Sequence, residues 1–158
     1  MKKLRIYLDT SVISHLDAPD VPDKEADTKR LWEDIKAGRY EVVLSDVVYD
    51  EVERCAEPKR TFMLSKIAEI NSHLAIRDDE AESLSALYFE MGGLPHKSKD
   101  DALHIAIAAV SNCNMILSWN FRHIVNLRAM KAVDAVNLME GYSPIRILSP
   151  SMLLGGEE

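Results

Sequence analysis

The stretch LRIYLDTS, residues 4–11, decides the fold of this chain. Its first five residues, Leu4–Leu8, are a short apolar run that predicts a buried strand. The run stops at Asp9, and the sequence Asp-Thr-Ser is a favoured start for a helix. A strand that passes directly into a helix opens a β–α unit, in which the next strand of the sheet lies parallel to the first.

The rest of the chain repeats this alternation of strand and helix. Further strands are predicted at Tyr40–Leu44, Met115–Leu117 and Ile145–Leu148, whereas His73–Arg77 is too short to assign. Helices are predicted around Val12–Leu16, at Asp27–Ala37, from Asp46 to about Cys55, from Pro58 onward, at Asp78–Met91, from Ser98 to Ser111 and from Asn120 to about Met139, with a loop over Ala18–Asp27. This pattern predicts an α/β fold, a three-layer α/β/α sandwich with a mainly parallel central sheet. We expect a single domain over residues 1–150 and a short C-terminal tail over residues 151–158.

Composition places the chain among soluble globular proteins. Its 158 residues are 47% hydrophobic and 28% charged, which suits one domain with a sizeable core. No apolar run approaches the roughly 20 residues that a membrane span needs, and no signal-like segment precedes Asp9, so we expect a cytoplasmic protein without membrane contact. Two cysteines, Cys55 and Cys113, are too few for a disulfide scaffold and cannot form a cysteine zinc site alone.

The chain carries 26 acidic and 19 basic side chains, a formal net charge of 19 − 26 = −7. This balance argues against a protein that coats long nucleic acid through a large basic surface. An enzyme that cuts a few phosphodiester bonds needs only local phosphate contacts, so the charge does not exclude a nuclease. It also suits a partner with an arginine-rich segment.

Acidic or amide side chains recur where strands end and helices begin. Asp9 follows the first strand, Glu51 lies on the helix after the second, Asp100 and Asp101 begin the buried helix before the third, and Asn120 follows the third. In a parallel sheet the functional crevice lies beyond the carboxyl ends of the strands, so one crevice could collect these side chains. Taken alone, Asp9 is as typical of a helix cap as of a functional site, Asp100, Asp101 and Asn120 are more typical of caps, and Glu51 is more typical of a solvated face.

Helical spacing narrows the choice for one of these acids. Val48, Val52 and Cys55 form one apolar stripe, and Glu51 lies at its border, so Glu51 is the acid of this helix expected to turn inward. The same spacing does not separate Asp100 from Asp101. Carboxylates that face one another repel strongly unless a hard cation neutralises them, which indicates a magnesium or manganese site.

Four strings together resemble the PIN-domain nucleases. They are IYLDTSVIS, VVLSDVVYDEVER, DALHIAIA and ILSWNFRHI, and they are most similar to the VapC-type toxins of bacterial and archaeal toxin–antitoxin pairs. The resemblance implies a metal-dependent ribonuclease that hydrolyses RNA phosphodiester bonds with Mg²⁺ or Mn²⁺. It further implies the toxin of a type II toxin–antitoxin system, with a cognate antitoxin and a homodimeric state.

The resemblance also assigns roles to individual residues. Asp9, Glu51 and Asp101 match the catalytic, metal-binding acids, and Thr10 or Ser11 matches the small hydroxyl residue that supports them. Asn120 stands where many family members carry a fourth Asp, so it is the fourth catalytic and metal-binding candidate.

An amide oxygen can ligate a metal but brings no charge. The departure at Asn120 therefore supports an alternative, a catalytically weak or inactive PIN-fold module that binds RNA or protein. A third hypothesis is a small-molecule phosphatase, which also carries an Asp after its first strand. That class has a second Asp two residues later, where this chain has Ser11.

Three basic residues lie near the expected crevice. Lys97, Lys99 and Arg122 are candidates for RNA phosphate contacts, and a solvated charge is an equal alternative for each.

Three ring side chains have both structural and functional interpretations. His104, one turn after Asp101, is more typical of a hydrogen-bonded core histidine than of a metal ligand. His123 is expected on a helix surface, although it could face the crevice. Trp119 could stack on a base, but packing at the end of the strand is favoured.

Overall fold

In the computed structural model, the strands pair into one parallel sheet of five strands. The structure describes residues 2–92, 94–95 and 99–155. Within them, the strands are β1 (Leu4–Leu8), β2 (Tyr40–Ser45), β3 (His73–Ala75), β4 (Met115–Leu117) and β5 (Arg146–Leu148). Their order across the sheet is β3-β2-β1-β4-β5, and every pair is parallel.

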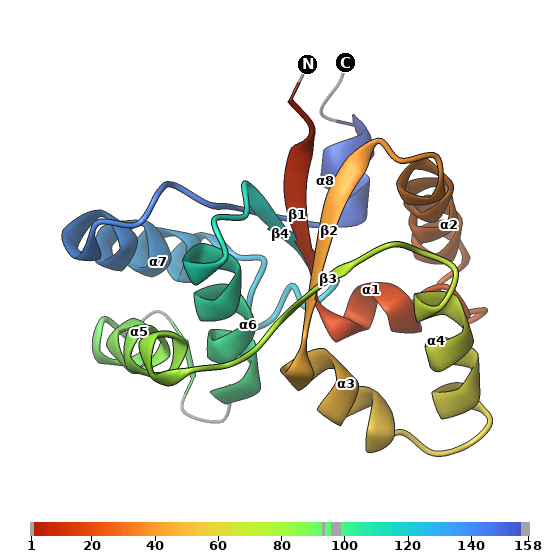
Figure 1. Ribbon diagram of the computed structural model, residues 1–158, viewed down its shortest axis with the longest axis horizontal. Helices are drawn as coiled ribbons and strands as arrows, with labels where there is room; N and C mark the ends of the chain where they lie inside the picture. Colours follow the sequence, from red (N-terminus) through yellow and green to blue (C-terminus); the bar gives the residue numbers. More distant parts are fainter. Residues whose placement is uncertain (1, 93, 96–98, 156–158) are drawn as a thin grey trace.

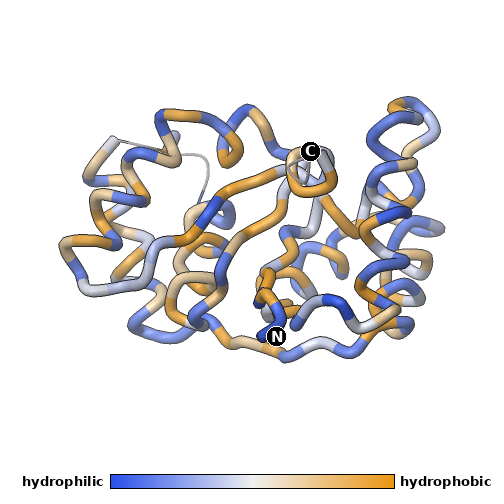
Figure 2. Tube along the Cα trace, turned by 90° about the horizontal axis from the view of Figure 1, so that it is seen from above, coloured by the Kyte–Doolittle hydropathy of each residue, from blue (hydrophilic) through white to orange (hydrophobic). Residues whose placement is uncertain are grey.

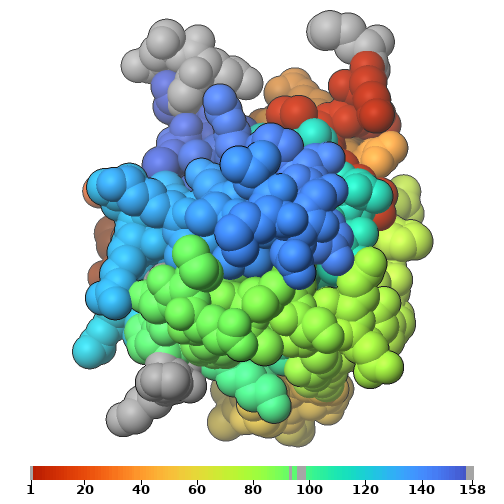
Figure 3. All heavy atoms as spheres, turned by 90° about the vertical axis from the view of Figure 1, so that its left-hand side faces the viewer, coloured from red at the N-terminus to blue at the C-terminus, as the bar shows by residue number. Residues whose placement is uncertain are grey.

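Helices cover both faces of this sheet. They are α1 (Thr10–Ser14), α2 (Pro22–Lys36), α3 (Asp46–Glu53), α4 (Lys59–Ile67), α5 (Asp79–Glu90), α6 (Lys99–Val110), α7 (Leu127–Glu140) and α8 (Pro150–Gly155). Helices α5, α6 and α7 lie on one side, and α1, α2 and α4 lie on the other (Figure 1). Figure 3 shows the outer surface of the first group, where α5 and α7 lie side by side. The predicted three-layer α/β/α sandwich is confirmed.

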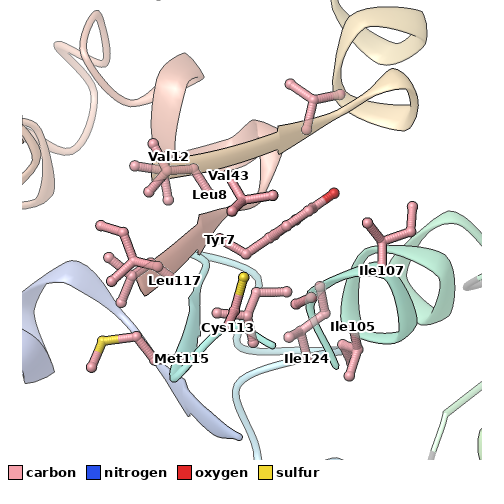
Figure 4. Close-up of a cluster of buried hydrophobic side chains, with 14 of the residues drawn as sticks. Tyr7, Leu8, Val12, Val43, Ile105, Ile107, Cys113, Met115, Leu117 and Ile124 are labelled. Atoms are coloured by element: carbon pink, nitrogen blue, oxygen red, sulfur yellow. The ribbon is translucent and has the colours of Figure 1, made fainter. Parts of the chain in front are cut away.

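The core lies where the central strands meet α6. The side chains of Ile6, Tyr7 and Leu8 are fully buried, so β1 has the continuous apolar character of a strand covered on both faces. Helix α6 is apolar nearly all round and is buried from Ala102 to Ala109. Figure 2 shows hydrophobic segments in the centre of the molecule, and Figure 4 shows Tyr7 among the apolar side chains of this core.

Two helices begin elsewhere than the sequence predicts. Helix α2 begins at Pro22, inside the segment predicted as a loop, because the fixed φ of proline suits the first turn of a helix. The predicted helix from Asn120 is wrong over residues 121–126, which form turns and a bend. Helix α7 begins at Leu127, where the side chain of Asn126 accepts a hydrogen bond from the Ala129 backbone N–H.

The end of the chain also carries a helix. Residues 151–158 were expected to form a tail, but α8 covers Pro150–Gly155 and contacts α2 and β5. The hydroxyl of Ser151 donates a hydrogen bond to the carboxylate of Asp27 on α2. Most of the expected tail is therefore docked on the domain, while residues 156–158 lie outside the described residues. The division at residue 150 stays a prediction.

In the part of the chain that the structure describes, no helix is long and apolar enough to cross a membrane.

Candidate metal centre

The strand order places a topological switch point between β1 and β4. The chain leaves β1 toward β2 on one side, and β4 pairs on the other side of β1, so the connections diverge there. In open parallel sheets such a switch point opens a crevice at the carboxyl ends of the strands. Asp9 follows β1 directly, and its backbone N–H donates to the carbonyl of Leu117, the last residue of β4, at 3.0 Å. Asp9 therefore lies at this switch point, at the carboxyl ends of β1 and β4.

Two hydroxyl groups hold one oxygen of the Asp9 carboxylate. Asp9 Oδ2 accepts hydrogen bonds from Ser11 Oγ at 2.6 Å and from Ser118 Oγ at 2.9 Å. The other oxygen, Oδ1, lies 3.3 Å from Nε2 of His104. Asp9 is only 5% exposed, so both oxygens lie in a largely desolvated environment. The predicted supporting role of Ser11 thus has a defined contact, whereas the contribution of Ser118 was not predicted.

Glu51 reaches the same place from α3. Thr10 Oγ1 donates to Glu51 Oε1 at 2.8 Å, and Nε2 of His104 contacts the same oxygen. Glu51 is turned inward, as its position on the border of the apolar stripe predicts. Asp50, its neighbour on the same helix, instead pairs with Arg77 on the surface.

The structure separates the two candidate acids at the start of α6. Asp100 pairs with Arg54, with 3.3 Å between Asp100 Oδ2 and Arg54 Nη2. Asp101 instead faces Asn120 and His123, and its Oδ2 lies 3.3 Å from Asn120 Nδ2 and 3.3 Å from His123 Nδ1. Burial and the nearby Asp9 carboxylate raise the pKa of Asp101, although His104 and His123 act against this rise. Asp101 is therefore the acid of α6 that joins the cluster.

Asn120 is oriented by a backbone contact. The backbone N–H of His123 donates to Asn120 Oδ1 at 3.1 Å, and because an N–H can only donate, this atom must be the amide oxygen. The amide nitrogen consequently points to Asp101. Asn120 stands at the position where many family members are expected to carry a fourth acid, and here it donates a hydrogen bond to Asp101. Metal ligation by Asn120 stays a prediction.

Two histidines contact the acids. His104 is fully buried and hydrogen-bonded, as predicted, but it also touches Asp9 and Glu51. Burial acts to lower the pKa of His104, but the carboxylates of Asp9, Glu51 and Asp101 outweigh it and raise this pKa. The favoured placement of His123 on a helix surface is wrong, because it lies in a turn with its ring against Asp101.

Two buried polar residues that the sequence analysis did not single out form hydrogen bonds on the side of His104 that faces away from the acids. Tyr7 Oη lies 2.6 Å from His104 Nδ1 and 2.6 Å from Ser45 Oγ. The available sequence signal was a tyrosine between the aliphatic residues Ile6 and Leu8, because a buried hydroxyl needs a partner.

The arrangement fits a divalent cation. Potential ligand atoms of Asp9, Glu51 and His104 all lie within 4.8 Å of one another. Burial, and after it the carboxylates of Asp9 and Glu51, raise the pKa of the neighbouring Asp101. Carboxylate-rich clusters of this kind match Mg²⁺ and Mn²⁺.

Of the three basic residues predicted to contact phosphates, the structure describes Lys99 and Arg122. Lys97 falls outside the described residues. Lys99 is exposed and lines a hollow with Ser85 and Phe89 of α5, and Arg122 is exposed and lines another hollow with Arg128. Their contacts with RNA phosphates stay predictions.

Trp119 packs at the end of β4, as favoured. It is 6% exposed, its indole Nε1–H donates to Thr28 Oγ1 at 2.9 Å, and its ring stacks on His15.

Fold and site together define an α/β domain that gathers carboxylates at the carboxyl edge of a parallel sheet, a suitable site for a divalent cation. Residues 6–124 match the family model of the PIN domain, and the chain belongs to that family. The matched segment contains Asp9, Glu51, Asp101 and Asn120. PIN domains are typically metal-dependent nucleases, so the fold is a nuclease fold. A search among curated proteins found no match to the chain.

Proposed function

We propose that this protein is a Mg²⁺- or Mn²⁺-dependent endoribonuclease that hydrolyses RNA phosphodiester bonds. The observation that carries the proposal is that ligand atoms of Asp9, Glu51 and His104 lie within 4.8 Å of one another, with Asp101 near enough for the Asp9 and Glu51 carboxylates to raise its pKa. Such a concentration of like charge costs stability unless it serves to bind a cation.

Asp9, Glu51 and Asp101 would hold the divalent cation, and one of them would orient the attacking water. The cation would supply Lewis-acid chemistry, which activates the water and offsets the charge that develops on the phosphate. Ser11 and Thr10 each donate to one carboxylate oxygen, which leaves Asp9 Oδ1 and Glu51 Oε2 for the cation. The leaving group is the ribose 3′-oxygen.

Cleavage of a mixed-sequence RNA tests this proposal. We expect cleavage with Mg²⁺ or Mn²⁺, none with EDTA, and none by Asp9→Asn. Asp100→Asn is the matched control, since it makes the same chemical change at a surface acid that pairs with Arg54. Cleavage by Asp9→Asn in the presence of chelator refutes the proposal, because it requires a different active site.

A second candidate function, a binding module without cleavage, is favoured by the orientation of Asn120. Its oxygen accepts the His123 backbone N–H, and its nitrogen donates to Asp101, so the fourth acidic position is neutral. The variant Asn120→Asp distinguishes the two functions. If the wild type binds RNA without cutting it and the variant cuts, the binding module is supported; cleavage by the wild type excludes it.

We further propose that the protein is the toxin of a type II toxin–antitoxin pair and acts as a cytoplasmic homodimer. The likeness of four sequence strings to VapC-type toxins supports this, and the net charge of −7 suits an antitoxin with a basic segment. A small adjacent reading frame with a DNA-binding region and a basic tail is the expected partner. Co-expression of that partner should relieve the growth arrest that we expect this chain to cause when it is expressed alone. Arrest that persists unchanged contradicts the pairing.

A further inference from the structure

A continuous chain of hydrogen bonds runs through the core and ends on Glu51. The backbone N–H of Val48 lies 3.4 Å from Ser45 Oγ, Ser45 Oγ lies 2.6 Å from Tyr7 Oη, and Tyr7 Oη lies 2.6 Å from His104 Nδ1. The other ring nitrogen of His104, Nε2, contacts Glu51 Oε1. The side chains of Tyr7, Ser45 and His104 have no solvent exposure, so water cannot replace any of these partners.

The two ends of the chain favour one direction. Val48 N–H can only donate, so Ser45 Oγ accepts from it and has its own hydrogen to donate to Tyr7 Oη. The Tyr7 hydroxyl then donates to His104 Nδ1, and a neutral imidazole carries its hydrogen on Nε2, where it meets the Glu51 carboxylate, which can only accept. In this arrangement every hydrogen along the chain has an acceptor. Chains of buried hydrogen bonds that point one way polarise one another, which strengthens the last contact, from His104 Nε2 to Glu51 Oε1.

We propose that His104 is a positioning residue of the metal centre and that Tyr7 and Ser45 set its tautomer. His104 and Thr10 together occupy Glu51 Oε1, so that Oε2 is presented to the cation. The same Nε2 lies 3.3 Å from Asp9 Oδ1, which fixes the spacing of the two acids. This inference rests on one part of the proposed function, namely that Asp9 and Glu51 hold the cation.

A purely structural role for His104 makes a different prediction. If the imidazole only fills the core, its replacement lowers the free energy of unfolding and leaves the affinity of the folded protein for metal unchanged. If it positions Glu51, its replacement weakens metal binding even where the protein is fully folded. Partners of this kind commonly contribute about 10- to 100-fold to metal affinity.

Calorimetric titration of the full, RNA-free chain with Mn²⁺ separates these roles. We expect His104→Leu to weaken Mn²⁺ binding about 10- to 100-fold. His104→Gln should recover most of the affinity, because its side-chain amide can place an N–H near the position of Nε2. Should the Leu variant not fold, Tyr7→Phe provides a second test, because it removes the group that sets the tautomer and leaves the imidazole in place.

Electron spin-echo spectroscopy of bound Mn²⁺ completes the test. We expect no coupling to a directly bound imidazole nitrogen in the wild type; such coupling overturns the positioning role by showing that His104 is a ligand. Equal Mn²⁺ affinity of wild type and folded His104→Leu also overturns it, as does absence of Mn²⁺ binding by the wild type. Because no RNA is present, a protein that binds Mn²⁺ but cuts no RNA refutes the proposed nuclease and leaves this inference standing.

Discussion

The hydroxyl of Tyr7 offers the sharpest single-atom perturbation in this fold. Tyr7→Phe removes one oxygen that bonds both Ser45 Oγ and His104 Nδ1 at 2.6 Å, with all three side chains fully buried. Ser45 keeps the Val48 N–H as a partner, whereas His104 Nδ1 is left unpaired. A buried polar atom without a partner costs about 1–3 kcal/mol. In a domain of this size, each kcal/mol lowers Tm by about 2–4 °C.

Urea and thermal unfolding in EDTA measure this cost without the contribution of bound metal. The matched control is Tyr88→Phe, because Tyr88 is also fully buried and its hydroxyl donates to Asn137 Oδ1 at 2.7 Å instead of to His104. We expect both variants to lose about 1–3 kcal/mol and only Tyr7→Phe to bind Mn²⁺ more weakly. A loss below about 0.5 kcal/mol for Tyr7→Phe refutes the reasoning, because that is the range of ordinary surface substitutions. Equal metal affinity of the two variants also refutes it.

Three further predictions follow from burial and charge. Burial and the Asp9 carboxylate raise the folded-state pKa of Asp101, so the ionisation of Asp101 lowers the free energy of unfolding as pH rises through this pKa. Asp101→Asn should therefore raise the metal-free Tm at pH 7.5, with a smaller gain near pH 4. The same variant should abolish stabilisation by Mn²⁺. An unchanged Tm at pH 7.5 contradicts this. Burial raises the pKa of Cys113 to about 12, so a thiol reagent at pH 8 should react with Cys55 alone in the native protein and with both thiols after denaturation. Rapid labelling of Cys113 in the native protein counts against its buried placement. Leu138 on α7 is 82% exposed, and Leu138→Lys should shift the expected homodimer toward monomer in light scattering, whereas an unchanged mass excludes this surface from the interface.

The sequence alone determined the local features of this protein. The apolar run Leu4–Leu8 ending at Asp9 predicts a strand whose carboxyl end carries an acid, and the structure has that strand with those bounds. The apolar stripe of α3 predicts that Glu51 turns inward, because helical periodicity is a property of a few neighbouring residues. The alternation of strands and helices predicts parallel pairing, because a helix that crosses over the sheet returns the chain to the end at which the previous strand began. The strand and the inward turn of Glu51 depend only on residues close in the sequence.

Only the tertiary structure decided how the acids meet. Asp100 and Asp101 have similar helical surroundings, and what separates them is the placement of Arg54 and Asn120 around the start of α6. Ser118 joins Asp9 across 109 positions of sequence, because β4 pairs beside β1.

The contact between Tyr7 and His104 likewise spans 97 positions and exists because α6 packs on the central strands. Hydrophobic periodicity carries no information about strand order or about which helix covers which strand. The residues that bear the charge could therefore be named from the sequence, whereas the buried hydrogen bonds that orient them are a consequence of the strand order β3-β2-β1-β4-β5.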